Sequence, residues 1–443
     1  MTAMDMDKGC FTGRKTSNVN IKIVGEYEGV VKNQEESGVC YDPNKHYSFV
    51  TRVFDLNHTA FKVEVYLPDN NNSEEFKTVG QGFIQPIHFK SSCGIIDVGL
   101  AENELPTGSV QVEYVIIKPL DDKCFHNIEN WTDRNWQNAG KTLNMGHRGC
   151  GSTFGSARSG FQENTIESFL KAYEKGADGL ELDVHVTKDL IPVIYHDLYL
   201  NAALQTKNES RCSQVIPVCD LTYQELQDLK IIHSRSAEFN DELQHRNGLQ
   251  QKLFPTLEEV LTNLPENFPF ELEVKYLETE QGHEDAPFLD INLYVDTLLK
   301  SVSKNIGNRK IILMCFSPVI VQLLSRKQKK FPVKIGVCGE TVKYPVYKDI
   351  RIRTIGRVVG FAQSEKILGI SCLCDNIITE NKGVFEEIKK RNLVVSTWGE
   401  DDNKSEIREL QRQMGVDVVC FDRIDEREHQ HSQPRTEGVR LFE

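Results

Sequence analysis

Two acidic residues separated by one position, Glu181 and Asp183, are the first candidates for chemistry in this chain of 443 residues. They lie in an apolar run of strand type, and residues two apart in a strand point to the same side. Two carboxylates on a common buried face repel each other unless a proton or a cation lies between them. Because oxygen ligands suit hard divalent cations, the pair predicts a site for Mg²⁺ or Ca²⁺.

A second alternating run, FELEVK at residues 270–275, adds further charges. Glu271, Glu273 and Lys275 share one side of this predicted strand. A buried lysine beside buried carboxylates favours an anionic partner, and a lysine near a metal ion forms a receptor for phosphate. Either glutamate could complete the metal site, because both lie on the same side.

The segment 179–197 ends near a histidine that the fold should bring to the first two acids. Its short connection at 187–189 leaves no room for a crossover helix, so a hairpin is expected. A turn centred near residues 188–189 would put His196 roughly opposite Glu181.

An earlier apolar run ends in the pair His147 and Arg148. His147 and His196 can exchange protons near neutral pH, and Arg148 with Lys275 can bind phosphate. Together these residue types indicate metal-assisted cleavage of a phosphoester. Two structural alternatives compete with this hypothesis. The histidines could be hydrogen-bonded core residues, and the acids could form buried ion pairs with Arg148 and Lys275 and bind nothing.

Five motifs make the chain resemble the glycerophosphodiester phosphodiesterase family: His147-Arg148-Gly149, Glu163-Asn164-Thr165, Glu181-Leu182-Asp183-Val184, Val193-Ile194-Tyr195-His196-Asp197 and Glu271-Leu272-Glu273-Val274-Lys275. The branch that it most resembles is that of the cytosolic glycerophosphocholine phosphodiesterases, which the segments 114–120 and 396–403 also resemble. The resemblance covers roughly residues 45–425 and is strongest over 143–197.

The resemblance implies a role for most of these residues. It implies that a divalent metal ion is held by Glu181, Asp183 and Glu273, which leaves Glu271 outside the metal site. It names His147 and His196 as the catalytic acid–base pair. The candidates for substrate binding are Arg148, Glu163, Lys275 and Trp398.

Some of the candidates around the substrate have alternatives. Glu163 could be only a charge at a helix N-terminus, where it would stabilise by about 0.3–1 kcal/mol. Trp398 could be a core aromatic residue, or a wall that packs on a choline group through a cation–π contact. Asp401 and Asp402 could draw a quaternary amine toward the site or simply be solvated.

The function that the resemblance implies is hydrolysis of a glycerophosphodiester, with glycerophosphocholine giving sn-glycerol 3-phosphate and choline. An attack by the glycerol hydroxyl would form a cyclic phosphate before hydrolysis. Lysophospholipids or other glycerophosphodiesters are alternative substrates, and a catalytically retired scaffold or a glycan-binding protein is the alternative outside enzymes. The residues after Asp197 and the loop at 151–160 depart from the general family pattern and bear on head-group preference.

Composition argues against two classes of partner and is compatible with a small-molecule substrate. The formal net charge of −13 argues against nucleic acid or an anionic membrane. The N-terminus lacks the apolar segment of a secretory signal, and no apolar run is long enough to span a membrane. We therefore expect a cytoplasmic protein with no integral membrane segment. The cysteines lack a framework spacing and are expected to be reduced thiols.

The spacing of apolar residues predicts an α/β architecture. Strands and helices alternate over residues 142–427, which predicts a (β/α)₈ TIM barrel with the acids gathered at one mouth. One strand candidate exceeds the eight of such a ring, and the hairpin strand before His196 is expected to lie outside it. The segment 198–255 is polar and poor in pattern, and we expect an insertion near the rim of the site.

Residues 18–120 carry short strands at regular intervals and predict a small antiparallel β-sandwich domain before the barrel. This domain could be a structural appendage or a module that contacts a partner or a glycan. The related branch also carries a starch-binding-type module, which has no clear counterpart here. A linker at 121–141 and flexible tails at 1–17 and 428–443 complete the expected layout.

Overall fold

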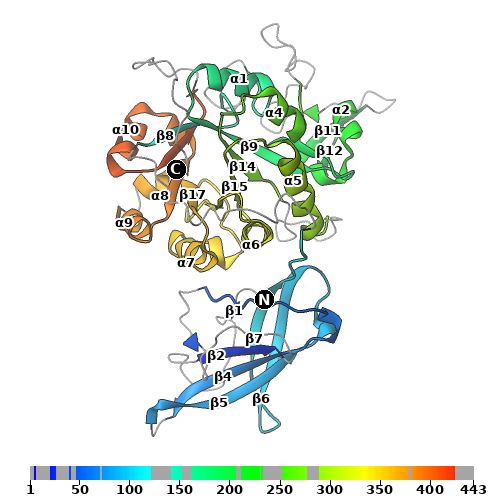
Figure 1. Cartoon of the computed structure of the whole chain (residues 1–443), viewed down its shortest axis with the longest axis vertical. Helices are drawn as coiled ribbons and strands as arrows, with labels where there is room; N and C mark the ends of the chain where they lie inside the picture. The colour runs from blue at the N-terminus through cyan, green and yellow to red at the C-terminus, as the bar shows by residue number, and fades with distance from the viewer. Residues whose placement is uncertain are drawn as a thin grey trace. The chain divides into compact units, whose positions relative to one another are not determined.

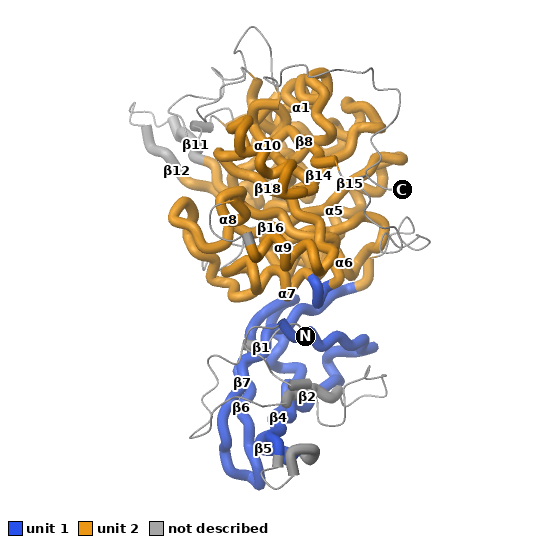
Figure 2. Tube along the Cα trace, turned by 90° about the vertical axis from the view of Figure 1, so that its left-hand side faces the viewer, with its two compact units in different colours: residues 1–118, 363–365 blue, residues 119–362, 366–443 orange. Residues whose placement is uncertain are grey.

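The chain forms two compact units in this computed structural model: residues 1–118 with 363–365, and residues 119–362 with 366–443 (Figure 2). The structure describes residues 4–5, 20–25, 39–40, 46–69, 72–120, 141–151, 161–205, 211–229, 231–232, 252–276, 289–378 and 382–424. The predicted linker and both predicted tails lie almost entirely outside the described residues. The domain boundaries inferred from the sequence therefore stay predictions.

Eight parallel strands in the described part of the chain close into a barrel (Figure 1). The first strand of the ring pairs with both the second and the last, which closes it. This confirms the predicted barrel. The strands are β8 (Leu143–Gly146), β9 (Gly179–Val186), β14 (Phe270–Val274), β15 (Ile311–Cys315), β16 (Val333–Val337), β17 (Gly369–Leu373), β18 (Val394–Trp398) and β19 (Val418–Phe421).

The barrel strands are buried along their length, apart from the half-buried Trp398 at the end of β18. Burial on both faces explains their near-continuous apolar runs, because helices cover the outside of a parallel ring while side chains fill its inside. Charged residues on the inner face therefore lie in a confined, poorly solvated space. Their pairing decides what the barrel can do.

Amphipathic helices surround the ring (Figure 1). In α5 the buried residues Ile291, Val295, Leu298 and Val302 recur at the spacing of one helix face. The sequence Thr256-Leu257-Glu258-Glu259 predicts a capping box at the start of α4. The structure confirms it, because the side chains of Thr256 and Glu259 each accept a hydrogen bond from the other residue's backbone N–H. The helices are α1 (Ile166–Glu174), α4 (Leu257–Asn263), α5 (Ile291–Asn305), α6 (Pro318–Lys327), α7 (Ile355–Glu365), α8 (Cys374–Ile378), α9 (Lys382–Lys390) and α10 (Ser405–Met414).

The alternation of strands and helices in the sequence also predicts a helix near residues 364–368, which is too late in the chain. The structure has α7 over Ile355–Glu365, and Leu368 already leads into β17. Gly356, Gly360 and several β-branched residues lower the intrinsic helix propensity of this stretch. Burial of one helix face overrides that local preference. No helix among the described residues has the length and apolar character needed to cross a bilayer.

The hairpin that leads to His196 is present. Strand β10 (Pro192–Ile194) pairs antiparallel with β9, with Ile194 opposite Val184, and lies at the edge of the sheet outside the ring. The amide of Tyr195 then donates to the carbonyl of Asp183 at 3.1 Å. The extra strand is therefore the one predicted, and it delivers His196 to the acidic strand.

The stretch 198–255 has more structure than its sequence pattern predicts. It contains β11 (Tyr199–Gln205), β12 (Arg211–Pro217), β13 (Ile231–Ile232) and α2 (Tyr223–Asp228), although 233–251 lie outside the described residues. Its buried residues Leu200, Val218 and Leu226 pack with Val193 and Tyr195 of the hairpin. The insertion therefore supports the segment that carries His196.

The unit before the barrel is antiparallel, as predicted. Its described strands form one sheet, in which alternate residues such as Val63, Val98 and Val112 are buried. The sequence pattern also predicts a strand at 47–56, and this prediction is wrong, because the segment is irregular and ends in a short 3₁₀ helix. The strands are β1 (Met4–Asp5), β2 (Asn20–Gly25), β3 (Val39–Cys40), β4 (Phe61–Asp69), β5 (Asn72–Ile84), β6 (Cys93–Glu102) and β7 (Leu105–Val115). A partner or glycan contact through this unit stays a prediction.

Inside the barrel, Glu271 has its own buried cation. The Lys334 ammonium lies 2.5 Å from Glu271 Oε2 and also contacts the hydroxyl of Ser396. All three side chains are buried. Glu271 is thus committed to an ion pair within the core.

Replacement of Lys334 by methionine should leave the Glu271 carboxylate buried without a partner. We expect the free energy of unfolding to fall by about 3–5 kcal/mol, as for other broken buried pairs, measured by urea titration followed by circular dichroism. The double variant Lys334→Met/Glu271→Met should recover most of this loss, because no unpaired charge remains. A double variant as unstable as the single one would contradict the pairing.

Candidate active site

Three carboxylates meet inside the barrel. Glu181 and Asp183 come from β9 and Glu273 from β14, two strands that pair in parallel with Asp183 opposite Glu273. One oxygen of each residue lies within 4.8 Å of the other two, and all three residues are buried. Glu273 lies next to the carboxyl end of β14 with Asp183 opposite it, and Glu181 lies two residues earlier on β9. Barrel enzymes carry their reactive groups at the carboxyl ends of the strands.

The charges of this acidic cluster are only partly balanced. Lys275 Nζ lies 2.9 Å from Asp183 Oδ1 and also contacts Glu273. Burial opposes ionisation of Asp183, but nearby cations, Lys275 foremost, hold its pKa well below the usual range. Burial, reinforced by the other two acids, raises the pKa of Glu181 well above its ordinary value. No donor among the described residues makes a hydrogen bond to Glu181 Oε1.

This arrangement fits a hard divalent metal ion. Oxygens at about 2.0–2.6 Å from a shared ion can be up to about 5 Å apart, which agrees with the spacing of the cluster. A cation among the three residues would satisfy Glu181 Oε1, and it would favour the charged forms of Glu181 and Glu273, whose pKa values burial raises. Ion pairs with Lys275 account for Asp183 and Glu273 but leave Glu181 unexplained.

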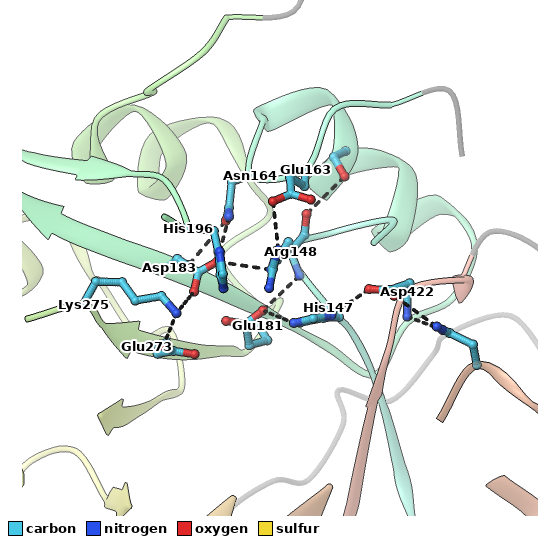
Figure 3. A network of polar contacts seen from close by, with 12 residues as sticks. His147, Arg148, Glu163, Asn164, Glu181, Asp183, His196, Glu273, Lys275 and Asp422 are labelled. Carbon is cyan, nitrogen blue, oxygen red and sulfur yellow. Dashed lines mark hydrogen bonds and ion pairs between the residues drawn. The ribbon is translucent and has the colours of Figure 1, made fainter. Parts of the chain in front are cut away.

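His147 reaches the cluster from the start of the ring. Its Nδ1 lies 2.6 Å from Asp422 Oδ1, and its Nε2 lies 3.9 Å from Glu181 Oε2 (Figure 3). Because a carboxylate only accepts hydrogen bonds, Nδ1 carries the proton and Nε2 is the nitrogen on the side of the acids. Burial opposes ionisation of Asp422, but His147, with smaller contributions from Asn403 and Arg148, holds its pKa well below the usual range.

Asp422, just after β19, is itself fixed by Asn403. The Asn403 amide donates to Asp422 Oδ2 at 3.0 Å, and the Asp422 backbone N–H donates to Asn403 Oδ1 at 2.8 Å. With both ends of the asparagine engaged, the carboxylate has one orientation. His147 therefore has a rigid support.

His196 has a similar arrangement and reaches the cluster from another direction, beside Asp183 (Figure 3). Its Nδ1 lies 2.7 Å from Asp197 Oδ1. Burial, the largest effect, opposes ionisation of Asp183, and the charge of His196 adds to that of Lys275 in lowering the pKa of this acid. The two imidazoles thus flank the acids from two directions. Each has one nitrogen held by a carboxylate.

Arg148 lies between Glu163 and the acidic cluster. Its Nη1 donates to Glu163 Oε1 at 2.9 Å, its Nε is 3.6 Å from Asp183 Oδ2, and its backbone N–H donates to Glu181 Oε2 at 3.0 Å. Burial opposes its charge, but the surrounding acids, Glu163 foremost, raise the pKa of Arg148. The guanidinium is therefore permanently charged. Glu163 does more than mark a helix N-terminus, because it orients this side chain.

Two residues of the network have left-handed backbone conformations. Arg148 has φ of 52° and Asn164 has φ of 58°, and the Asn164 N–H donates to the Arg148 carbonyl at 3.0 Å. Asparagine tolerates this region, whereas arginine in it is uncommon. The Asn164 amide also donates to Asp183 Oδ2 at 2.7 Å. The local strain is offset by contacts that aim both residues at the acids.

Trp398 lies apart from this network. Its ring centroid is 5.7 Å from that of Phe316 and 5.6 Å from that of Tyr344, and it also packs on the buried residues Leu143 and Met145. These are the contacts of a core aromatic residue, which is one of the two predicted alternatives for Trp398. A contact with substrate stays a prediction.

The model of the Glycerophosphoryl diester phosphodiesterase family matches residues 147–426 of the chain. The matched segment contains the acidic cluster, both histidines and their supporting carboxylates. The chain belongs to this family. The resemblance inferred from the five motifs is therefore confirmed.

Other members of the family are similar over most of this chain. Human glycerophosphocholine phosphodiesterase GPCPD1 is 34% identical over 440 residues, and its rat counterpart is 30% identical over 441. Both matches cover 93% of this chain and 64% of the relative, so the chain spans 64% of the length of these proteins. Glycerophosphocholine phosphodiesterase GDE1 of Candida albicans is 28% identical, over 72% of this chain and 31% of that protein.

In this member of the glycerophosphoryl diester phosphodiesterase family, the structure brings together all of the predicted site residues except Trp398 (Figure 3). The ambiguity between two glutamates is resolved in space, because Glu273 joins the cluster and Glu271 pairs with Lys334. Asp402 was expected either to draw a quaternary amine toward the site or to be solvated. It is buried and accepts a hydrogen bond from Gln411 at 2.5 Å, so it is not solvated.

Asp422, Asn403, Asp197 and Asn164 were given no role in the sequence interpretation. Asp422 carried a usable signal, because it ends the last strand of the barrel, where reactive groups of this fold gather. Asn403 carried none, since its role arises from a contact with a residue 19 positions away. Asp197 and Asn164 lie inside recognised motifs, but only their geometry shows what they hold.

Metal binding tests the acidic cluster without reference to catalysis. Glu181→Gln keeps the shape of the side chain but removes one charged ligand, so the affinity for Mg²⁺ or Ca²⁺ should fall by about tenfold or more in isothermal titration calorimetry. Glu409→Gln on α10 removes the same charge at an exposed residue outside the cluster and should bind as the unmodified chain does. Equal affinity in all three proteins would contradict a metal site at these residues.

Proposed function

We propose that this chain hydrolyses glycerophosphodiesters and that glycerophosphocholine is its preferred substrate, giving sn-glycerol 3-phosphate and choline. The observation that carries the proposal is the pair of carboxylate-held histidines flanking a buried acidic cluster beside two cations. Membership of the family and the names of the human and fungal relatives support it.

Glu181, Asp183 and Glu273 would hold a divalent metal ion, Mg²⁺ or Ca²⁺. When bound, such an ion polarises a phosphoryl oxygen and orients a neighbouring hydroxyl group. The protein supplies the fixed geometry for this, because paired strands set the separation of the acids. Lys275 limits their mutual repulsion from one side.

Arg148 and Lys275 would bind the phosphodiester and balance the negative charge that grows as the bond breaks. Both are buried cations, since nearby acids raise the pKa of each against the opposing effect of burial. Glu163 holds one edge of the Arg148 guanidinium, which leaves the donors of its other edges for oxygen atoms.

His147 and His196 would transfer the protons. One imidazole takes the proton of the attacking hydroxyl group or water, and the other gives a proton to the oxygen of the departing choline. If the glycerol hydroxyl attacks, its oxygen bonds to phosphorus as the bond to choline breaks, and water then opens the cyclic phosphate. Asp422 and Asp197 keep each ring in one orientation.

A lysophospholipid is the second candidate substrate. The loop after β16 exposes Val342 and Val346, two apolar side chains at the end of the barrel that carries the acidic cluster. An acyl chain could pack on them. A scaffold without catalytic activity is disfavoured, because burying the acidic cluster together with Arg148 and Lys275 is costly and such a protein would not require it.

Removal of a catalytic group should abolish turnover without unfolding the chain. His147→Ala and Glu181→Ala should each lower kcat for glycerophosphocholine by about 10²–10⁴-fold, with little change in thermal midpoint. Choline release from the purified full chain measures this, and a chelator followed by added Mg²⁺ or Ca²⁺ should remove and restore activity. His58→Ala, an exposed histidine of the first unit, is the matched control. Activity that survives either change contradicts these roles.

Asp422 is expected to act through His147. Asp422→Asn preserves the size of the side chain but can donate to Nδ1, which favours the wrong ring tautomer. We expect kcat to fall by about 10²–10⁴-fold while KM and metal affinity stay nearly unchanged, because no ligand or substrate contact is lost. A change in thermal midpoint with normal kcat would assign Asp422 a structural role only.

A further inference from the structure

A row of aromatic rings begins beside the acidic cluster and follows the carboxyl ends of neighbouring strands. Phe316 and Tyr347 are stacked with centroids 6.2 Å apart, and the edge-on pair of Phe316 and Trp398 is followed by Tyr344. Tyr347 contacts Cys338, which directly follows β16 at the carboxyl end of the barrel. Burial, then Cys338 and then the charge of Glu273 raise the pKa of Tyr347, which marks its end of the row as the one near the acids. Trp398 and Tyr344 form the far end of this aromatic row.

A lysine lies at that far end between two acidic residues. Lys343, next to Tyr344 in the chain, places its Nζ 2.7 Å from Asp375 Oδ2 and 3.5 Å from Asp401 Oδ2. Asp375 lies in α8 directly after β17, and Asp401 lies in the 3₁₀ turn η9 (Glu400–Asn403) directly after β18. The ammonium group therefore links two adjacent strand ends at the mouth of the barrel.

The loop that carries this lysine is held at its ends and exposed in the middle. Asn376 donates to the carbonyl of Cys338 at one end, and Asp349 accepts from the Arg351 N–H at 2.8 Å at the other. Val342 is fully exposed, and the lysine side chain is 40% exposed. Lys343 is therefore accessible to solvent while it pairs with the two acids.

We propose that Lys343 is the resident cation of a head-group subsite formed by Asp375, Asp401, Tyr344 and Trp398, and that a quaternary ammonium group displaces it. This rests on the proposed function. Aromatic faces and carboxylates are the groups that bind trimethylammonium, which cannot donate hydrogen bonds as lysine does. Return of the lysine to the acids then promotes release of choline.

The indole N–H of Trp398 adds a second sign of a ligand. It is buried and has no hydrogen-bond partner in the described part of the chain. Buried donors of this kind are normally satisfied, so a diester or glycerol oxygen is a fitting acceptor. The same ring can then contact the charged methyl groups with its face and an oxygen with its edge.

Calorimetric titration of the full chain with choline chloride tests the displacement without requiring turnover. Lys343→Gln removes the competing cation and should bind choline about threefold to tenfold more tightly, with the gain reduced by added salt. Lys304→Gln is the matched control, because this exposed lysine ends α5 at the opposite end of the barrel and should leave choline affinity unchanged. Unchanged or weaker choline binding in Lys343→Gln overturns the proposal.

Hydrolysis separates this inference from the proposed function. In Lys343→Gln, KM should fall for glycerophosphocholine but not for glycerophosphoglycerol, whose head group is neutral, whereas Asp375→Asn should raise KM for glycerophosphocholine alone. A similar rise in KM for both diesters in Lys343→Gln would make the lysine a phosphate contact and overturn the subsite. If the unmodified chain cleaves no diester, the proposed function fails, while the choline titration still decides the role of Lys343.

Discussion

Mutual repulsion among three buried carboxylates is the constraint on which this barrel depends. Glu181, Asp183 and Glu273 face one another in a space that water hardly reaches, and ionising them together is costly. Lys275 and Arg148 offset part of the cost. Two residues before Glu273 on β14, Glu271 has a buried partner in Lys334. The two sites differ: Glu271 has a buried cation as its partner, whereas Glu181 Oε1 has no hydrogen-bond donor among the described residues. Charge balance within the core alone would not leave such an oxygen, so this difference favours a bound cation at the cluster.

Closure of the ring gives the cluster its proton-transfer groups. His147 follows β8 and Asp422 follows β19, 275 residues later, yet the two meet because these strands are neighbours. His196 arrives on a hairpin outside the ring and depends on a small separate core. The two histidines therefore have similar hydrogen bonds but are held by different parts of the structure. The barrel itself fixes His147, whereas the hairpin and the inserted segment fix His196.

The sequence was sufficient to predict those features that depend on neighbouring residues alone. Period-two alternation in 179–186 and 270–274 placed the acids on one face, and the capping residues of α4 marked its start. It failed where tertiary contacts override propensity, as in the glycine-containing α7, or where a small sheet forms within a polar insertion. Among site residues, the motif acids and histidines could be predicted. The support of His147 could not, because that contact spans the whole barrel domain.

Three consecutive residues in η9 show why position in the chain does not predict role. Asp401 pairs with Lys343 and Lys404 at the surface, and Asn403 fixes the carboxylate that holds His147. Asp402 between them turns inward, where burial raises its pKa to about 6 and Gln411 donates to it. This inward residue anchors the turn to α10. One short turn thus connects the proposed head-group end to the proton-transfer end, so a change that loosens Asp402 would disturb both at once.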